Sequence, residues 1–320
     1  MELIRDFTHI DKNDVALAGG KGASLGEMTK AGIPVPKGFV ILSTAFEKFL
    51  EDTHLNAEID AILDTVSHKK IHTIENASEK ISALLIEADI PKDISSEIKK
   101  NFKKLNARYV AVRSSATAED SESATWAGQL KSYLNTTEKE LLLHVKKCWA
   151  SLFTPRAIFY RFEKILHTQR ISVAVVVQKM IESKQSGVAF SVHPITQDRN
   201  QLIIEAGFGL GEAIVSGHIT PDSYVVQKKP RKIIDTTIHV KNKGLYRAEK
   251  TGTLWRTISK RKGETQVLSD KEILELSKLV LAIEKHYGFA VDIEWAKERN
   301  KFFIVQSRPI TTLKKDEGLA

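Results

Sequence analysis

The stretch VDIEWAKERNKFFIVQSRP, from Val291 to Pro309, carries the clearest structural signal in the chain. Two runs of alternating apolar and polar residues flank the charged residues 297–301, a pattern typical of a β-hairpin. If the turn centres on Asn300, one face of the hairpin is apolar and can anchor it in a core. The side chains predicted on that face are Ile293, Trp295, Phe303 and Val305.

The opposite face of the predicted hairpin is polar. Asp292 and Glu294 are two residues apart and share this face, with Arg308 expected opposite Asp292 and Gln306 opposite Glu294. Carboxylate oxygens are hard ligands that suit Mg²⁺, and arginine makes forked contacts with phosphate. The face therefore favours a magnesium polyphosphate site. The alternative is a structural hairpin whose solvated face holds a cross-strand salt bridge.

Size and composition indicate a globular protein with room for two lobes. The chain has 320 residues, of which 42% are apolar and 28% charged. No apolar run approaches the roughly 20 residues that span a bilayer, and the N-terminus lacks the apolar core of a secretory signal. The single cysteine, Cys148, excludes an internal disulfide framework and a cysteine-based zinc site. These features predict a cytoplasmic protein without a membrane partner.

The net charge of +8 is spread over short basic runs without interleaved aromatic residues. A groove for single-stranded nucleic acid combines both, so we expect no nucleic-acid partner. Solvated surface is the simplest role for these runs, and attraction of an anionic ligand or an acidic partner is the alternative.

The order of predicted elements favours an α+β fold with two lobes. Residues 1–181 form the expected N-terminal lobe, in which residues 51–107 read as helical and polar. Residues 182–320 form the expected C-terminal lobe, which is rich in strands and ends in the hairpin. Ser269 and Glu272 have the spacing of a capping box at the start of a helix.

Three further segments could carry chemistry. The glycine-rich run 19–22, with Lys21, precedes a helical start and favours anions, although it lacks the Walker A spacing and could be only a tight turn. Arg113 precedes a loop of small hydroxyl residues that could cover phosphates, and a surface loop with local turns is the alternative. The glycines of segment 205–212 resemble a dinucleotide fingerprint, but Glu212 stands where a third glycine is required. Close approach of the backbone to a nucleotide fits that segment better.

Taken together, these segments resemble the nucleotide-binding domain of the phosphoenolpyruvate synthase and pyruvate phosphate dikinase family. The matching stretches are GGKGASLGEM, AVRSSATAED, WAGQ, VVVQKM, SGVAFSVHP, IEAGFGLGEAIVSG, ITPDSYVV and DIEW with IVQSRPI. They cover the chain from about residue 19 to 311 in the order the family has them. The resemblance implies a two-lobed ATP-grasp fold that binds its nucleotide between the lobes.

The resemblance also implies roles for individual residues. Phosphates would be held by Lys21, Arg113 and Arg308, which would carry the catalysis. Metal and nucleotide would be held by Glu294 and Gln306, with Asp292 in support. Gln178 would begin the linker against which adenine packs, Gly128 would belong to a loop that covers the phosphates, and Glu205 and Glu212 would lie near the ribose and metal. The implied cofactors are ATP and Mg²⁺.

The family's enzymes carry a phosphorylated histidine on a separate swivelling domain, and none of the ten histidines here lies in a matching loop. The resemblance therefore implies a phosphotransferase of the pyruvate, water dikinase type that is incomplete by itself. A partner in trans, or a longer parent chain, would supply the histidine, and a small-molecule acceptor such as pyruvate would be handled elsewhere. Ser307 to Leu313 also resembles rifampin phosphotransferases, which is one alternative. A non-catalytic ATP-sensing module is another.

Overall fold

The computed structural model describes residues 1–67, 69–117, 131–163, 172–311 and 313. The chain divides into two compact units, one made of residues 1–30 and 37–180, the other of residues 31–36 and 181–320. Each unit combines helices with a β-sheet, which confirms the predicted α+β class. Within the described ranges, no helix combines the length and the apolar character needed to cross a membrane.

The first unit is built on a five-stranded sheet in the order β1-β2-β5-β3-β4. Its strands are β1 (Ile4–Asp6), β2 (Gly38–Ile41), β3 (Val110–Ala116), β4 (Ser132–Thr136) and β5 (Val173–Lys179). Its α-helices are α1 (Val15–Lys30), α2 (Ser43–Asp52), α3 (Leu55–Asp64), α4 (Ile71–Glu87), α5 (Lys92–Leu105), α6 (Glu138–Ala150) and α7 (Pro155–Glu163). The short 3-10 helices are η1 (Phe7–His9) and η2 (Ser151–Phe153).

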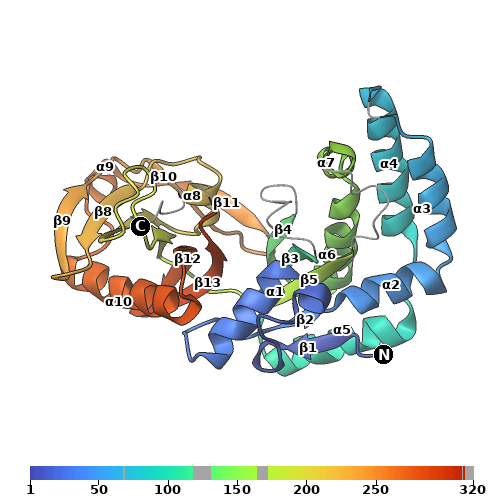
Figure 1. Ribbon diagram of the computed structural model, residues 1–320, viewed down its shortest axis with the longest axis horizontal. Helices are drawn as coiled ribbons and strands as arrows, with labels where there is room; N and C mark the ends of the chain where they lie inside the picture. The colour runs from blue at the N-terminus through green and yellow to red at the C-terminus, as the bar shows by residue number, and fades with distance from the viewer. Residues whose placement is uncertain (68, 118–130, 164–171, 312, 314–320) are drawn as a thin grey trace, which may run out of the picture. The chain divides into compact units, whose positions relative to one another are not determined.

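Helices cover both faces of this sheet (Figure 1). On one face, Val112, Val175 and Val177 pack into a core with α2, α4, α6 and α7, which is centred on the fully buried Trp149. Helix α1 lies on the other face, where strands β2 and β3 approach it. We call this second face the α1 face. Burial of the large apolar core is the main force that holds the unit together.

The second unit is built on a six-stranded sheet in the order β13-β12-β6-β7-β8-β9, with a separate pair, β10 and β11. Its strands are β6 (Gln185–Phe190), β7 (Gln201–Phe208), β8 (Asp222–Gln227), β9 (Lys232–Thr237), β10 (Lys243–Arg247), β11 (Thr253–Thr257), β12 (Val291–Glu298) and β13 (Lys301–Pro309). Its helices are α8 (Glu212–Val215), α9 (Lys260–Gly263) and α10 (Asp270–Tyr287).

Helix α10 packs along one face of the six-stranded sheet, as Figure 1 shows in orange. The predicted capping box is confirmed. The Ser269 side chain accepts a hydrogen bond from the backbone N–H of Glu272, and the Glu272 side chain accepts one from the backbone N–H of Ser269. The helix ends at Gly288, which has a left-handed φ of 76°. With α10 on one side, the opposite face of the sheet is left for the polar residues of β12 and β13.

Candidate functional site

The hairpin at the end of the chain has the predicted pairing. Asp292 lies opposite Arg308, and Glu294 lies opposite Gln306. The turn consists of Arg299 and Asn300 alone, with φ of 45° and 63°. Two consecutive residues with positive φ form the type I′ turn, whose twist matches that of the flanking strands.

One part of the hairpin prediction is wrong. Ile293 and Trp295 are buried as expected, but Phe303 and Val305 are only half-buried, and the core side chains of β13 are Phe302 and Ile304. The cause is a β-bulge: Glu294 pairs with Gln306 but Trp295 pairs with Ile304, so Val305 is an extra residue on β13. The extra residue shifts the alternation of β13 by one position on the turn side of the bulge.

The polar residues of the hairpin continue into a row across four strands. Gln306 pairs with Glu294, Glu294 pairs with Val188, and Val188 pairs with Glu205. Directly paired residues share a face, so both glutamates point to the side opposite α10. With strands about 4.8 Å apart, the backbones of the two glutamates lie roughly 10 Å from each other. We call this the carboxylate face.

Burial makes ionisation of the carboxyl groups on the carboxylate face less favourable. It raises the pKa of Asp292, the charge of Glu294 adds to the rise, and Arg308 only partly offsets it. Burial likewise raises the pKa of Glu205, and the charge of Asp292 adds to it. Carboxylates that are partly desolvated and near one another bind a proton or a cation more readily than isolated ones.

Arg308 holds one oxygen of Asp292. Its Nε donates to Oδ2 at 2.8 Å and its Nη2 lies 2.7 Å from the same atom. Oδ1 takes no part in this ion pair. The arginine side chain is 44% exposed and the aspartate only 13%, so the guanidinium can reach solvent-borne anions while the carboxylate stays sheltered.

The carboxylates do not already form a metal cage. Across the described residues, no group of three or more His, Cys, Asp or Glu side chains is placed to hold a metal ion. Magnesium in nucleotide sites is often bound by only one or two carboxylates together with phosphate oxygens. The carboxylate face therefore suits a metal that arrives with phosphates better than a metal bound by protein alone.

The short helix that begins at Glu212 covers the carboxylate face. This helix is α8, and a side chain on Gly207 would contact Ile214 of that helix. Gly207 follows Glu205 by two residues on β7, so α8 covers the face that Glu205 shares. Glu212 is exposed as a residue, but neighbouring atoms partly desolvate its carboxyl group and raise its pKa, which the charge of His218 partly offsets.

Two glycines of the second unit, Gly209 and Gly187, lie against the backbone of neighbouring segments. Gly209 has a φ of 91°, and a Cβ there would lie 2.2 Å from the carbonyl oxygen of Leu245. A Cβ on Gly187, in β6, would lie 1.8 Å from the carbonyl oxygen of Glu205. These two positions accommodate the protein's own backbone, and the approach of a nucleotide to segment 205–212 stays a prediction.

In the first unit, Arg113 and Gln178 share the α1 face. Arg113 pairs with Val176, and Ala111 pairs with Gln178. The two polar side chains are thus diagonal neighbours, about 7–8 Å apart on adjacent strands. Gln178 is only 3% exposed, and its Nε2 has no hydrogen-bond partner among the described residues. A buried amide without a partner is costly, and a bound ligand could satisfy it.

The segment after Arg113 differs from the prediction. Ser114, Ser115 and Ala116 belong to strand β3 instead of a loop, and both serines are fully buried. Strand β3 pairs with β5 along all seven of its residues, which extends it past the expected end at Val112. The remainder of the predicted loop, with Gly128, lies outside the described residues.

Lys21 lies on helix α1, just after a break in that helix. Gly19 has φ 68° and ψ 171°, so the helix restarts at Gly20 and Lys21 is the second residue of the new segment. The predicted glycine-rich turn is thus one kinked residue inside a longer helix. Sequence reasoning did not single out Ser115, whose bonding partner Gly22 is 93 positions away in the chain.

Comparison with known proteins gives a consistent result. The family described as "Pyruvate phosphate dikinase, AMP/ATP-binding domain" matches residues 15–319. A probable phosphoenolpyruvate synthase from Methanocaldococcus jannaschii is 45% identical over 98% of this chain and 27% of its own length. A phosphoenolpyruvate synthase from Pyrococcus furiosus is 41% identical over 98% of this chain and 44% of its own.

A rifampicin phosphotransferase from Bacillus subtilis is 40% identical over 97% of this chain and 36% of its own length. The chain therefore spans less than half the length of each of these curated relatives. Among solved structures, a D-alanine-D-alanine ligase from Helicobacter pylori is 12% identical over 66% of this chain and 45% of its own, with a TM-score of 0.27.

Proposed function

The chain belongs to the pyruvate phosphate dikinase AMP/ATP-binding domain family, and we propose that it binds ATP with Mg²⁺ and transfers phosphoryl to a histidine on a separate domain. The observation that carries the proposal is the carboxylate face, where Asp292 lies opposite Arg308 and Glu294 lies opposite Gln306, with Glu205 two strands away. Two carboxylates beside a phosphate-binding arginine are what a metal–triphosphate complex requires.

Magnesium fits the residues of the carboxylate face. Asp292 and Glu294 supply hard oxygen donors, and Gln306 adds an amide oxygen. Burial raises the pKa of Asp292 and the charge of Glu294 adds to the rise, so a bound cation would relieve the cost of ionising this carboxyl group. When bound, Mg²⁺ neutralises charge on the transferring phosphoryl group. The Oδ1 atom of Asp292, which Arg308 does not use, remains available to a metal. Arg308 itself is exposed enough to bind phosphate.

On the α1 face, Lys21 and Arg113 supply the cationic groups that we assign to phosphate. Arg113 is buried in the middle of a sheet, which preorganises its guanidinium and limits the reorganisation needed during transfer. We assign Gln178 to the adenine, because its buried Nε2 is a donor in search of an acceptor. Adenine ring nitrogens are such acceptors. Gly128, Glu205 and Glu212 are proposed to complete the nucleotide's surroundings.

The histidine acceptor is proposed from the longer relatives. Transfer through a covalent phosphohistidine splits one difficult step into two, and it needs a domain beyond those matched here. The rifampicin phosphotransferase relative makes an antibiotic acceptor a second candidate beside pyruvate.

The proposal is tested by adding a separately expressed histidine domain from one of the relatives to the chain with Mg-ATP. We expect AMP and a phosphorylated partner to form together, with the β-phosphoryl on the histidine and the γ-phosphoryl passed to water or to inorganic phosphate. Arg113→Ala should slow AMP formation by about 10²–10³, the usual loss when one charge-stabilising donor is removed. Arg108→Ala, which removes an exposed arginine just before β3, is the matched control. Absence of AMP from the wild-type chain, or full activity of Arg113→Ala, would rule out this mechanism.

A further inference from the structure

The break in helix α1 places Lys21 at the start of a helical segment. Gly19 separates a first turn, Val15 to Ala18, from the segment that runs from Gly20 to Lys30. The direction of the new segment, and with it the origin of the Lys21 side chain, depends on how the backbone is held at the break.

One side chain from another strand holds both sides of the break. The Oγ of Ser115 donates to the carbonyl oxygen of Ala18 at 3.0 Å, and it accepts from the N–H of Gly22 at 3.3 Å. At an ordinary helix start, the N-cap side chain accepts from the N–H two or three residues on. Gly19 has no side chain, so Ser115 supplies the capping hydroxyl from strand β3.

The contact at the break leaves no room for another arrangement. A Cβ on Gly19 would lie 2.2 Å from Ser115 Oγ and 2.4 Å from the Ser115 carbonyl oxygen. The positive φ of Gly19 also disfavours any residue with a side chain. Strand β3 and the break are therefore in direct contact, and Ser115 itself is fully buried.

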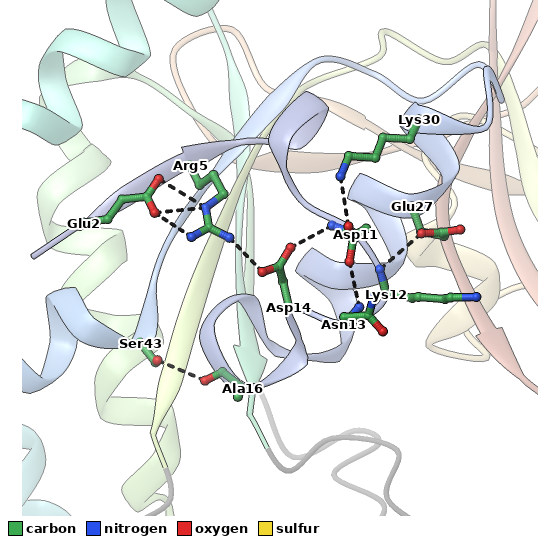
Figure 2. Close-up of polar contacts among 10 residues, drawn as sticks. All are labelled: Glu2, Arg5, Asp11, Lys12, Asn13, Asp14, Ala16, Glu27, Lys30 and Ser43. Carbon is green, nitrogen blue, oxygen red and sulfur yellow. Dashed lines mark hydrogen bonds and ion pairs between the residues drawn. The ribbon is translucent and has the colours of Figure 1, made fainter.

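Figure 2 shows polar contacts of α1 on either side of the break. Before it, the Oγ of Ser43 donates to the carbonyl of Ala16 at 3.2 Å. After it, the Lys30 ammonium lies 3.0 Å from Asp11, and Glu27 accepts from the backbone N–H of Lys12 at 3.2 Å. These bonds fix the two ends of α1, whereas Ser115 bonds at the point where Lys21 emerges.

We infer that Ser115 is a positioning residue, which sets the start of the Lys21 segment relative to Arg113. Arg113 and Ser115 are two residues apart on β3 and share the α1 face. A single hydroxyl thus links the strand that presents one cation to the helix that presents the other. This inference rests on the proposed function, in which both cations bind phosphate.

The test is a double-mutant cycle on the full chain, with the dissociation constant for Mg-ATP measured by calorimetry. Ser115→Ala should weaken Mg-ATP binding roughly tenfold or more, since small misplacements of a charged group are costly. In a Lys21→Ala background, the same change should cost less than about twofold, because its effect passes through Lys21. Ser114→Ala is the matched control: Ser114 is equally buried, but its Oγ bonds to Lys131 on the opposite face.

A second ligand separates positioning from general damage. Adenosine has no phosphates, so Ser115→Ala should leave adenosine binding within about twofold of wild type. If Ser115→Ala does not fold, Ser115→Cys keeps a similar size with a weaker acceptor and should show a smaller loss in the same direction. Wild-type affinity of the serine variants, or an equal loss with and without Lys21, would overturn the inference alone. Failure of the wild-type chain to bind Mg-ATP would overturn the proposed function and, with it, the inference.

Discussion

At the scale of single residues, the chain places ionisable groups where folding alone would not favour them. Asp292 and Glu205 are both partly buried on the carboxylate face, and burial raises the pKa of each. A carboxyl group in such a place destabilises the fold when it ionises. Groups with this property are concentrated at functional sites, which supports a role in cation binding.

Glu205→Gln should stabilise the chain without ligand in a pH-dependent way. The pKa of Glu205 is higher in the folded than in the unfolded chain, so its penalty is absent below the ordinary pKa and grows as pH rises through the raised value. Urea midpoints of variant and wild type should therefore converge below the ordinary glutamate pKa of 4.5 and diverge as the pH rises above it. A constant difference across this range would contradict the assignment of the penalty to Glu205.

Glu294→Gln should weaken metal-dependent binding of ATP by about tenfold or more, because it removes a charged oxygen ligand while keeping the size of the side chain. Binding of ATP measured with a chelator present should change far less. The matched control is Glu275→Gln, an exposed glutamate on α10, across the sheet from the carboxylate face. Equal losses from both variants would show that the effect is one of overall charge.

At the scale of elements, the hairpin is well specified by its sequence but not in every detail. Alternation and the charged turn predict the pairing of Asp292 with Arg308. They do not predict the bulge at Val305. The alternation of apolar and polar residues does not show which residue of a strand is unpaired, so the bulge is recognised only from the burial of the neighbouring side chains. The misplaced core residues, Phe303 and Val305, follow from that single omission.

The same limit applies in the first unit. The glycine-rich run and the Arg113 segment are visible in the sequence, but the bridge that joins them is not. Ser115 contacts Ala18 and Gly22, which are more than 90 positions away in the chain. The residues next to Ser115 in the sequence do not distinguish a buried serine in a strand from a serine in a loop. Local patterns therefore identify the segments, and tertiary contacts decide how they are held.

The turn of the hairpin offers a test of its type I′ geometry. Arg299 has a φ of 45°, a left-handed conformation that costs most residues about 1 kcal/mol and that asparagine tolerates better. Arg299→Asn should raise the free energy of unfolding by about 0.5–1 kcal/mol, measured by urea denaturation. Arg231→Asn, at an exposed position between β8 and β9 whose φ is not positive, should give no such gain. A destabilised Arg299→Asn variant would argue against this turn.

At the scale of the whole molecule, the two units carry different chemistry. The first unit carries Lys21 on helix α1 and presents Arg113 and Gln178 on the α1 face of its sheet, and the second presents the acidic residues of its carboxylate face. Residues 31–36 belong with the second unit, where the carbonyl of Pro34 accepts from the N–H of Ile304 at 2.9 Å. The assignment of residues 31–36 to the second unit depends on contacts with a strand that is distant in the sequence, so local sequence patterns do not predict it.

The most direct test of the central claim is the unfolding of the full chain in the presence of Mg-ATP. A ligand that binds only the native state at a hundredfold excess over its dissociation constant raises the free energy of unfolding by about 2.7 kcal/mol. We predict that Mg-ATP produces a saturable stabilisation of this size, and that ATP with a chelator produces much less. A folded chain whose stability does not respond to Mg-ATP at any concentration would contradict the account.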